Sequence, residues 1–169
     1  MDDPGRDVVP HIPRLRRYAR ALTGERARAD DLVQDTLERA LIKLHLWQTG
    51  SDMRAWLFTL MHNVFINQLR TQAGRLTVAL DDEAAQVAVR PTQSDGLEVR
   101  DLQAALLRLP EEQREVLLLV GLEQMTYEET AGVLAIPIGT VMSRLSRARE
   151  RLRGLLAGST TPAALKVVK

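Results

Sequence analysis

Arginines recur near the C-terminal end of the chain in a pattern suited to binding nucleic acid. Residues 139–153 carry five arginines and one acidic residue, whereas residues 97–138 carry a net charge of −5. Arg144, Arg147 and Arg151 fall at i, i+3 and i+7, so on a helix they share one face. Guanidinium groups donate hydrogen bonds to phosphate oxygens and to guanine edges. The pattern therefore favours a nucleic-acid-binding face, although a solvated amphipathic helix would carry it too.

A helix-turn-helix is the element that would position these arginines. Residues 126–135 predict its first helix, Pro137 and Gly139 mark the turn, and the second helix begins near Thr140. On that second helix an apolar stripe recurs at helical spacing and is expected to be buried, namely Val141, Leu145, Ala148 and Leu152. A helix with one apolar and one basic stripe can pack on a small domain while it presents cations outward.

The N-terminal half predicts three longer helices. The first begins near Ile12 and stops at Thr23 and Gly24, the second covers about residues 27–46, and the third covers residues 52–70. In the second helix the side chains expected to face inward are Val33, Leu37, Ala40, Leu41 and Leu44. The third helix is apolar beyond one stripe, so it is either buried from two sides or offers a surface to a partner.

Loop chemistry interrupts the helical pattern over residues 74–96, which carry a net charge of −2 and predict a mobile linker. Helical spacing resumes over residues 97–109, where Leu102, Leu106 and Leu109 are expected to face inward. The predicted fold is all-α, with two small helical domains joined by the linker. Their expected extents are residues 1–73 and 97–157, followed by a tail over residues 158–169.

Composition excludes several classes of protein. The chain of 169 residues has no cysteine, so it has neither a disulfide framework nor a thiolate metal site. His11, His45 and His62 lack the spacing of metal ligands, and no metal or cofactor is expected. The acidic N-terminus has no apolar run, and the longest apolar stretches, such as residues 116–120, are too short for a bilayer. These features predict a cytoplasmic protein without membrane insertion.

Four ordered segments give the chain a specific resemblance over nearly its whole length. They are DDLVQDTLERA, RAWLFTLMHN, LPEEQREVLLL and IPIGTVMSRLSRARERL. Together they resemble the extracytoplasmic-function (ECF) group of sigma-70 family transcription initiation factors. The N-terminal half is similar to sigma region 2, and the C-terminal half is similar to region 4. A lone helix-turn-helix would be weak support, whereas this ordered set is specific.

The resemblance implies a polymerase-binding face on the second predicted helix. In the family this face docks on the clamp coiled coil of the RNA polymerase β′ subunit, and the β subunit is a further expected partner. Here its polar residues are Asp31, Gln34, Asp35, Glu38 and Arg39. Taken alone, such residues more often form a solvated face.

The resemblance also divides promoter reading between the two halves. Region 2 opens and reads the −10 element, and the matching positions are Trp56, Thr59 and Asn63, although Trp56 is equally suited to a core. Asn67 stands where many relatives carry aspartate, which leaves the −10 sequence open. Region 4 reads the −35 duplex through its second helix. There the base-edge candidates are Met142, Ser143, Ser146 and Arg147, and the phosphate candidates are Thr140, Arg144 and Arg149.

The expected function is therefore that of an alternative sigma factor, with core RNA polymerase, promoter DNA and a regulatory anti-sigma factor as partners. A sigma-like decoy that binds only an anti-sigma factor is one alternative, but it predicts loss of the basic recognition face. A stand-alone helix-turn-helix regulator is another, and it explains only the C-terminal half. An enzyme is not expected, because no nucleophile–base pair, glycine-rich phosphate loop or metal cluster is evident in the sequence.

Overall fold

A computed structural model of the chain describes residues 3–78 and 97–159, and within these ranges all regular structure is helical. This confirms the predicted all-α class. The N-terminal domain contains α1 (Pro4–Val8), α2 (Ile12–Thr23), α3 (Arg26–Lys43) and α4 (Met53–Val78), with short 3-10 turns at Val9–His11 and Leu44–Leu46. The C-terminal domain contains α5 (Leu97–Leu107), α6 (Glu111–Gly121), α7 (Tyr127–Leu134) and α8 (Ile138–Ser159).

Helix boundaries follow the local chemistry closely. Gly24 ends α2 in the left-handed conformation, with a φ of 72°, and its N–H donates to the Arg20 carbonyl at 2.9 Å. The third predicted helix is longer than expected, because α4 continues to Val78. The first residues of the predicted linker are therefore helical, and its remaining residues, 79–96, lie outside the described part of the chain.

The core of the N-terminal domain lies where α2, α3 and α4 meet. Leu15, Leu32 and Leu57 are fully buried there, and the Tyr18 and Phe58 rings meet edge to face with centroids 5.1 Å apart. The prediction for Leu41 was wrong, because this side chain is 61% exposed. The inward side of α3 passes through Val33 and Ala40, and Leu41 lies one residue beyond it, about 100° around the helix.

The C-terminal domain buries most of the predicted stripe of its last helix, although Leu152 is only partly buried. Val141, Leu145 and Ala148 of α8 are fully buried, which confirms this part of the helix-turn-helix prediction. On α5 the prediction holds only in part. Leu106 is buried, as is Leu109 just after the helix, but Leu102 is 40% exposed. Because α5 packs mainly against α8 and α2, only its C-terminal turn meets the centre of the core.

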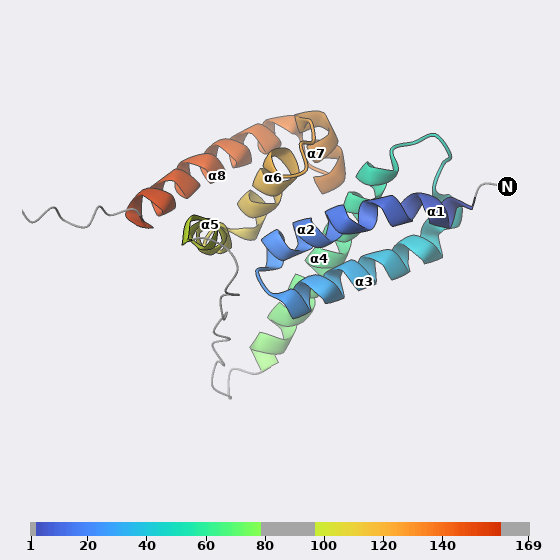
Figure 1. Ribbon diagram of the computed structural model, residues 1–169, viewed down its shortest axis with the longest axis horizontal. Helices are drawn as coiled ribbons and strands as arrows, with labels where there is room; N and C mark the ends of the chain where they lie inside the picture. Colours follow the sequence, from blue (N-terminus) through green and yellow to red (C-terminus); the bar gives the residue numbers. More distant parts are fainter. Residues whose placement is uncertain (1–2, 79–96, 160–169) are drawn as a thin grey trace, which may run out of the picture.

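The two domains pack directly against one another. Helix α4 contacts α7, and α2 contacts both α5 and α6, so Figure 1 shows the C-terminal helices gathered along one side of α2 and α4. This packing explains why α4 has more apolar surface than a single core requires. Its residues face α3 on one side and the C-terminal domain on another, so the helix is buried from two sides. Within the two described ranges, no helix combines the length and apolar character needed to cross a bilayer.

Candidate nucleic-acid and protein-binding interfaces

Local hydrogen bonds fix the helix-turn-helix. The Thr126 hydroxyl accepts from the Glu129 N–H at 3.1 Å, and the Glu129 carboxylate accepts from the Thr126 N–H at 3.3 Å, which makes a capping box. Ala135 ends α7 in the left-handed conformation, with a φ of 53°. The Pro137 carbonyl then accepts from the N–H groups of Thr140 and Val141 and opens the first turn of α8. These bonds set the angle at which α8 leaves the domain.

The outward face of α8 carries most of the residues predicted to read DNA. Five of the seven are exposed, namely Met142, Ser143, Ser146, Arg147 and Arg149, and Thr140 is partly buried near the helix start. The Ser143 hydroxyl donates to the Thr140 carbonyl at 3.1 Å. Beside this face lies a shallow hollow of about 380 Å³, lined by Tyr127, Met142, Leu145, Ser146, Arg149 and Arg153. Its mixed apolar and cationic lining suits a base edge flanked by phosphates.

Arg144 differs from the other predicted DNA contacts. Its guanidinium lies 3.7 Å from the Glu112 carboxylate of α6, and only about a quarter of its side chain is exposed. Glu112 itself is well exposed, so this ion pair is weakly held. The Arg144 guanidinium is therefore partly occupied by an ion pair within its own domain, whereas the exposed Arg147 can contact a ligand.

The predicted −10 residues lie along α4 at positions 56, 59 and 63. Trp56 is half-buried: part of its side chain packs against the hydrophobic core, and the rest lies at the surface. The Thr59 hydroxyl donates to the Ala55 carbonyl at 2.8 Å. Asn63 is exposed, which leaves its amide available to a ligand. Of the three side chains, Asn63 is the best placed to contact a nucleotide in this arrangement.

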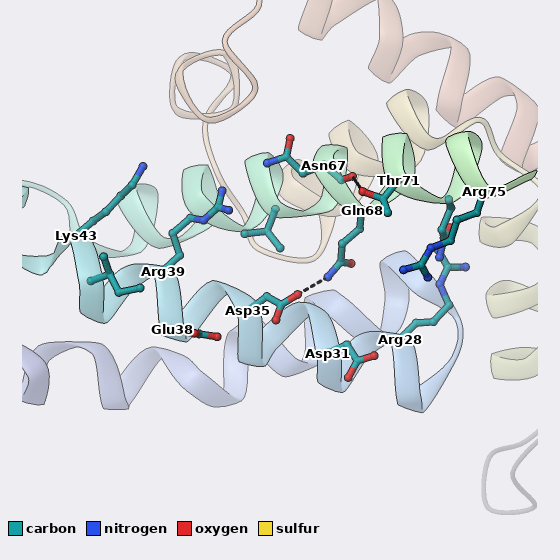
Figure 2. A pocket seen from close by; sticks show the side chains of 13 residues that line it. Arg28, Asp31, Asp35, Glu38, Arg39, Lys43, Asn67, Gln68, Thr71 and Arg75 are labelled. Carbon is teal, nitrogen blue, oxygen red and sulfur yellow. Dashed lines mark hydrogen bonds between the residues drawn. The ribbon is translucent and has the colours of Figure 1, made fainter. Parts of the chain in front are cut away.

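The predicted polymerase-binding residues line a groove between α3 and α4. This open groove has a volume of about 970 Å³, and its α3 wall includes Asp31, Asp35, Glu38 and Arg39, together with Arg28, Ile42 and Lys43. Figure 2 shows the first four facing side chains of α4. The Gln68 amide donates to the Asp35 carboxylate at 2.9 Å and fixes its position. Gln34 is exposed on α3 but does not line the groove.

Three exposed apolar side chains at the end of α3, one of which also lines this groove, were not identified from the sequence as a possible binding surface. Leu41, Ile42 and Leu46 are each more than 60% exposed at the end of α3 and in the following 3-10 turn. Apolar residues are common at the end of an amphipathic helix, so the sequence carries no signal that separates an exposed leucine there from a buried one. Only the packing of α3 shows which way these side chains point.

A cluster of charged contacts joins the two domains. Glu123, which follows α6, is 3% exposed, and its carboxylate lies 3.3 Å from Arg17 and 3.5 Å from Arg14 of α2. Arg54 of α4 donates to the Glu123 carbonyl at 3.1 Å and pairs with the Glu129 carboxylate at 3.1 Å. We call Arg14, Arg17, Arg54, Glu123 and Glu129 the interdomain ionic cluster.

A second buried glutamate lies close by. Glu115 of α6 is 3% exposed, and its carboxylate lies 2.7 Å from His62 Nδ1 of α4. Tyr18 of α2 is buried in the same region. Its pKa is raised well above 10.0, first by burial and then by Glu115 and Glu123. The phenol therefore stays neutral at this contact.

Burial raises the pKa of the Glu123 carboxyl above its ordinary value of 4.5, although Arg17, Arg14 and Arg54 oppose the shift. A carboxyl whose pKa is raised by folding contributes stability below its unfolded pKa and loses this contribution as the pH rises through the folded pKa. We therefore expect Glu123→Gln to be more stable than the wild type at neutral pH, with the difference vanishing near pH 4. Thermal melts of both proteins across this range measure the effect. A difference that grew toward acid pH would contradict the assignment.

Each half of the chain matches a known protein family. Residues 8–62 match a family model described as the Sigma2 domain of PhyR, and residues 100–152 match one described as Sigma-70, region 4. The chain is 41% identical over 150 residues to the ECF RNA polymerase sigma factor EcfG of Rhodopseudomonas palustris. That alignment covers 89% of this chain and 83% of the relative.

Two solved structures resemble the whole arrangement. One is the sigma factor RpoE in complex with the anti-sigma factor NepR from Bartonella quintana, with a TM-score of 0.79, 37% identity and coverage of 90% of this chain and 95% of that one. The other is the anti-anti-sigma factor PhyR from the same organism, with a TM-score of 0.59, 20% identity and coverage of 87% and 48%. At that identity, PhyR supports the fold alone. Coverage of 90% spans both domains, so the packed arrangement itself is similar to that of NepR-bound RpoE.

Proposed function

Because this chain belongs to the ECF group of RNA polymerase sigma factors, which are alternative sigma factors that direct transcription initiation, we propose a division of labour between its two domains. The C-terminal domain reads the −35 element through α8. The N-terminal domain binds core RNA polymerase through α3 and reads the −10 element through α4. Since the relatives are sigma factors rather than enzymes, we assign the chain no covalent step.

The observation that carries the −35 assignment is the two-sided character of α8. Val141, Leu145 and Ala148 anchor the helix in the domain, while Ser143, Ser146 and Arg147 point outward along one exposed face. A helix held in this way can enter the major groove without losing its own packing. Its outward serines and arginines match base edges and phosphates in size and hydrogen bonding.

Arg147→Ala is expected to weaken −35 recognition while association with core polymerase is unchanged. A bidentate arginine–guanine contact contributes about 1–3 kcal/mol of discrimination, so promoter affinity should fall by about tenfold to a hundredfold. Footprinting of holoenzyme over the −35 region measures the loss. Arg16→Ala, which removes an exposed arginine from α2, serves as the matched control. An unaltered −35 footprint with Arg147→Ala would sink the assignment.

The −10 assignment rests on the face of α4 that begins at Trp56. Asn63 offers both a donor and an acceptor to the edge of an unstacked base, and the indole of Trp56 offers a stacking surface at the margin of the core. Thr59 lies between them on the same face, with its hydroxyl bonded to the backbone. Because this hydroxyl is already bonded, Thr59 contacts a nucleotide through its methyl group and its shape.

The polymerase assignment rests on the groove between α3 and α4. Asp35→Arg reverses a charge at its centre and breaks the bond to Gln68, so association with core polymerase should fall by about tenfold. Co-purification with core polymerase measures this. Asp30→Arg makes the same change at an exposed residue of α3 outside the groove lining, and it should leave the yield unchanged. Equal yields from both variants would refute the assignment.

We further propose that an anti-sigma factor binds this chain. The supporting observation is that the packed arrangement of the two domains is similar to that of RpoE bound to NepR. A partner that recognises both domains in this arrangement would compete with core polymerase and with the promoter. The decoy alternative is disfavoured, because the exposed basic face of α8 would serve no purpose in a protein that does not bind DNA.

A further inference from the structure

The outward face of α8 carries apolar side chains among its polar ones. Met142 is 48% exposed, and Ile138, one helical turn before it, is 40% exposed. Their outward neighbours along the helix are serines and arginines, namely Ser143, Ser146, Arg147 and Arg149. A single exposed apolar residue is ordinary on a protein surface. These two lie in the first turns of the helix proposed to enter the major groove, and such turns are the part of a recognition helix that meets base edges.

We propose that Met142 determines part of the −35 sequence by contacting the 5-methyl group of a thymine, and that Ile138 extends this apolar contact. The proposal rests on the promoter-reading function proposed above. It adds the chemical group on the DNA that the start of α8 recognises.

The major groove offers one apolar group among many polar ones. Guanine, adenine and cytosine present only hydrogen-bond donors and acceptors there, whereas thymine presents its O4 acceptor and its C5-methyl group. A methionine opposite polar atoms would remove their water without replacing the lost hydrogen bonds, which is unfavourable. Opposite a methyl group, the same side chain removes apolar surface of both partners from water. Met142 therefore favours thymine and disfavours the other three bases for one physical reason.

The hollow beside Met142 supplies the contacts that hold this side chain against a base. Tyr127 of α7 and the exposed arginines Arg149 and Arg153 of α8 line the same hollow as Met142. Phenol and guanidinium groups donate hydrogen bonds to phosphate oxygens, and such contacts set the register of a protein on the duplex. The methionine side chain is unbranched and adaptable, so it can follow the position of a methyl group within that register.

Removal of a single methyl group from the DNA tests the contact. Holoenzyme first selects its preferred −35 element from duplexes randomised over that element. Each thymine of the selected element, on either strand, is then replaced by deoxyuridine, which keeps the hydrogen-bonding groups and lacks only the methyl group. At one thymine at least, the wild type should lose affinity by about fourfold, which is about 0.8 kcal/mol and corresponds to the burial of one methyl group.

Three variants show whether this loss belongs to Met142. Met142→Ala should bind the thymine and deoxyuridine duplexes equally, whereas Met142→Leu should keep most of the difference. Val99→Ala shortens an exposed apolar side chain of α5 and is the matched control, which should keep the whole difference. Because each variant is compared with itself on two duplexes, a general loss of stability or of DNA affinity cancels from the ratio.

The possible failures are distinguishable. A deoxyuridine effect that persists unchanged in Met142→Ala would overturn the proposal, as would a selected element in which no thymine is sensitive to the replacement. Holoenzyme that selects no −35 sequence at all would instead refute the proposed function of α8.

Discussion

Replacing Arg114 with methionine is expected to lower the free energy of unfolding by about 3–5 kcal/mol, which corresponds to a fall in Tm of about 10 °C. The Arg114 guanidinium is buried, and it donates to the carbonyls of Leu22, Leu106, Leu107 and Leu109 at 2.7–2.9 Å. These carbonyls lie at or just beyond the C-terminal ends of α2 and α5, where backbone acceptors lack helical partners and the helix dipoles favour a cation.

Methionine fills much of the same space but donates nothing, so four acceptors would lose a donor. Burial already lowers the pKa of Arg114, which shows that the guanidinium has lost hydration and depends on these carbonyls. Arg114→Lys should recover less than half of the loss, because one ammonium cannot reach acceptors on two helices. Chemical denaturation of both variants measures the effect. The control is Arg108→Met, which makes the same substitution at an exposed arginine just after α5. A loss of less than 1 kcal/mol in Arg114→Met would contradict this role.

Phe58→Ala should have an effect of similar size, about 3–5 kcal/mol of lost stability, because it leaves a cavity in the core of the N-terminal domain. Phe58 is 1% exposed and supports the Tyr18 ring. Tyr18 in turn lies near the buried carboxylates of Glu115 and Glu123 at the contact between the domains. The cavity is therefore expected to weaken the contact between the domains as well as the core.

Thermal unfolding of Phe58→Ala followed by calorimetry tests both parts. We expect one transition at a lower temperature, because the two domains share a buried interface and should lose their structure together. Val99→Ala, at an exposed position of α5, should leave the Tm within about 2 °C of the wild type. Two separate transitions in the wild type would show that the interface does not couple the domains.

Local patterns in the sequence were enough to predict most of the helices. The limits of α2 follow from Pro13 near its start and Gly24 at its end, and the buried stripe of α8 follows from helical spacing. The predictions that Leu41 and Leu102 face inward failed for a common reason. Each lies at the edge of an apolar stripe, and the neighbouring helices decide whether such an edge is covered. Helical periodicity predicts the direction in which a side chain points. It does not show how much of that face of the helix the neighbouring helices cover.

The contact between the domains was beyond sequence reasoning. Arg54 donates a hydrogen bond to the Glu123 carbonyl, although the two residues are 69 positions apart in the sequence. No local sequence pattern connects them. Glu115 and Glu123 are acidic residues on or beside amphipathic helices, where such side chains are normally solvated. Their burial is a property of the domain packing. The DNA-reading and polymerase-binding residues remain predictions, and the structure contributes the exposure of Arg147 and Asn63 and the groove beside Asp35.

The half-exposed arginines of the ionic cluster have a consequence for how salt acts on this protein. Dissolved ions screen the pairs of Arg14 and Arg17 with Glu123, so rising ionic strength should favour separation of the domains. Rising ionic strength also weakens DNA binding, because binding to phosphates releases condensed counterions. Salt is therefore expected to act on this protein at two separate places, the contact between the domains and the exposed basic face of α8.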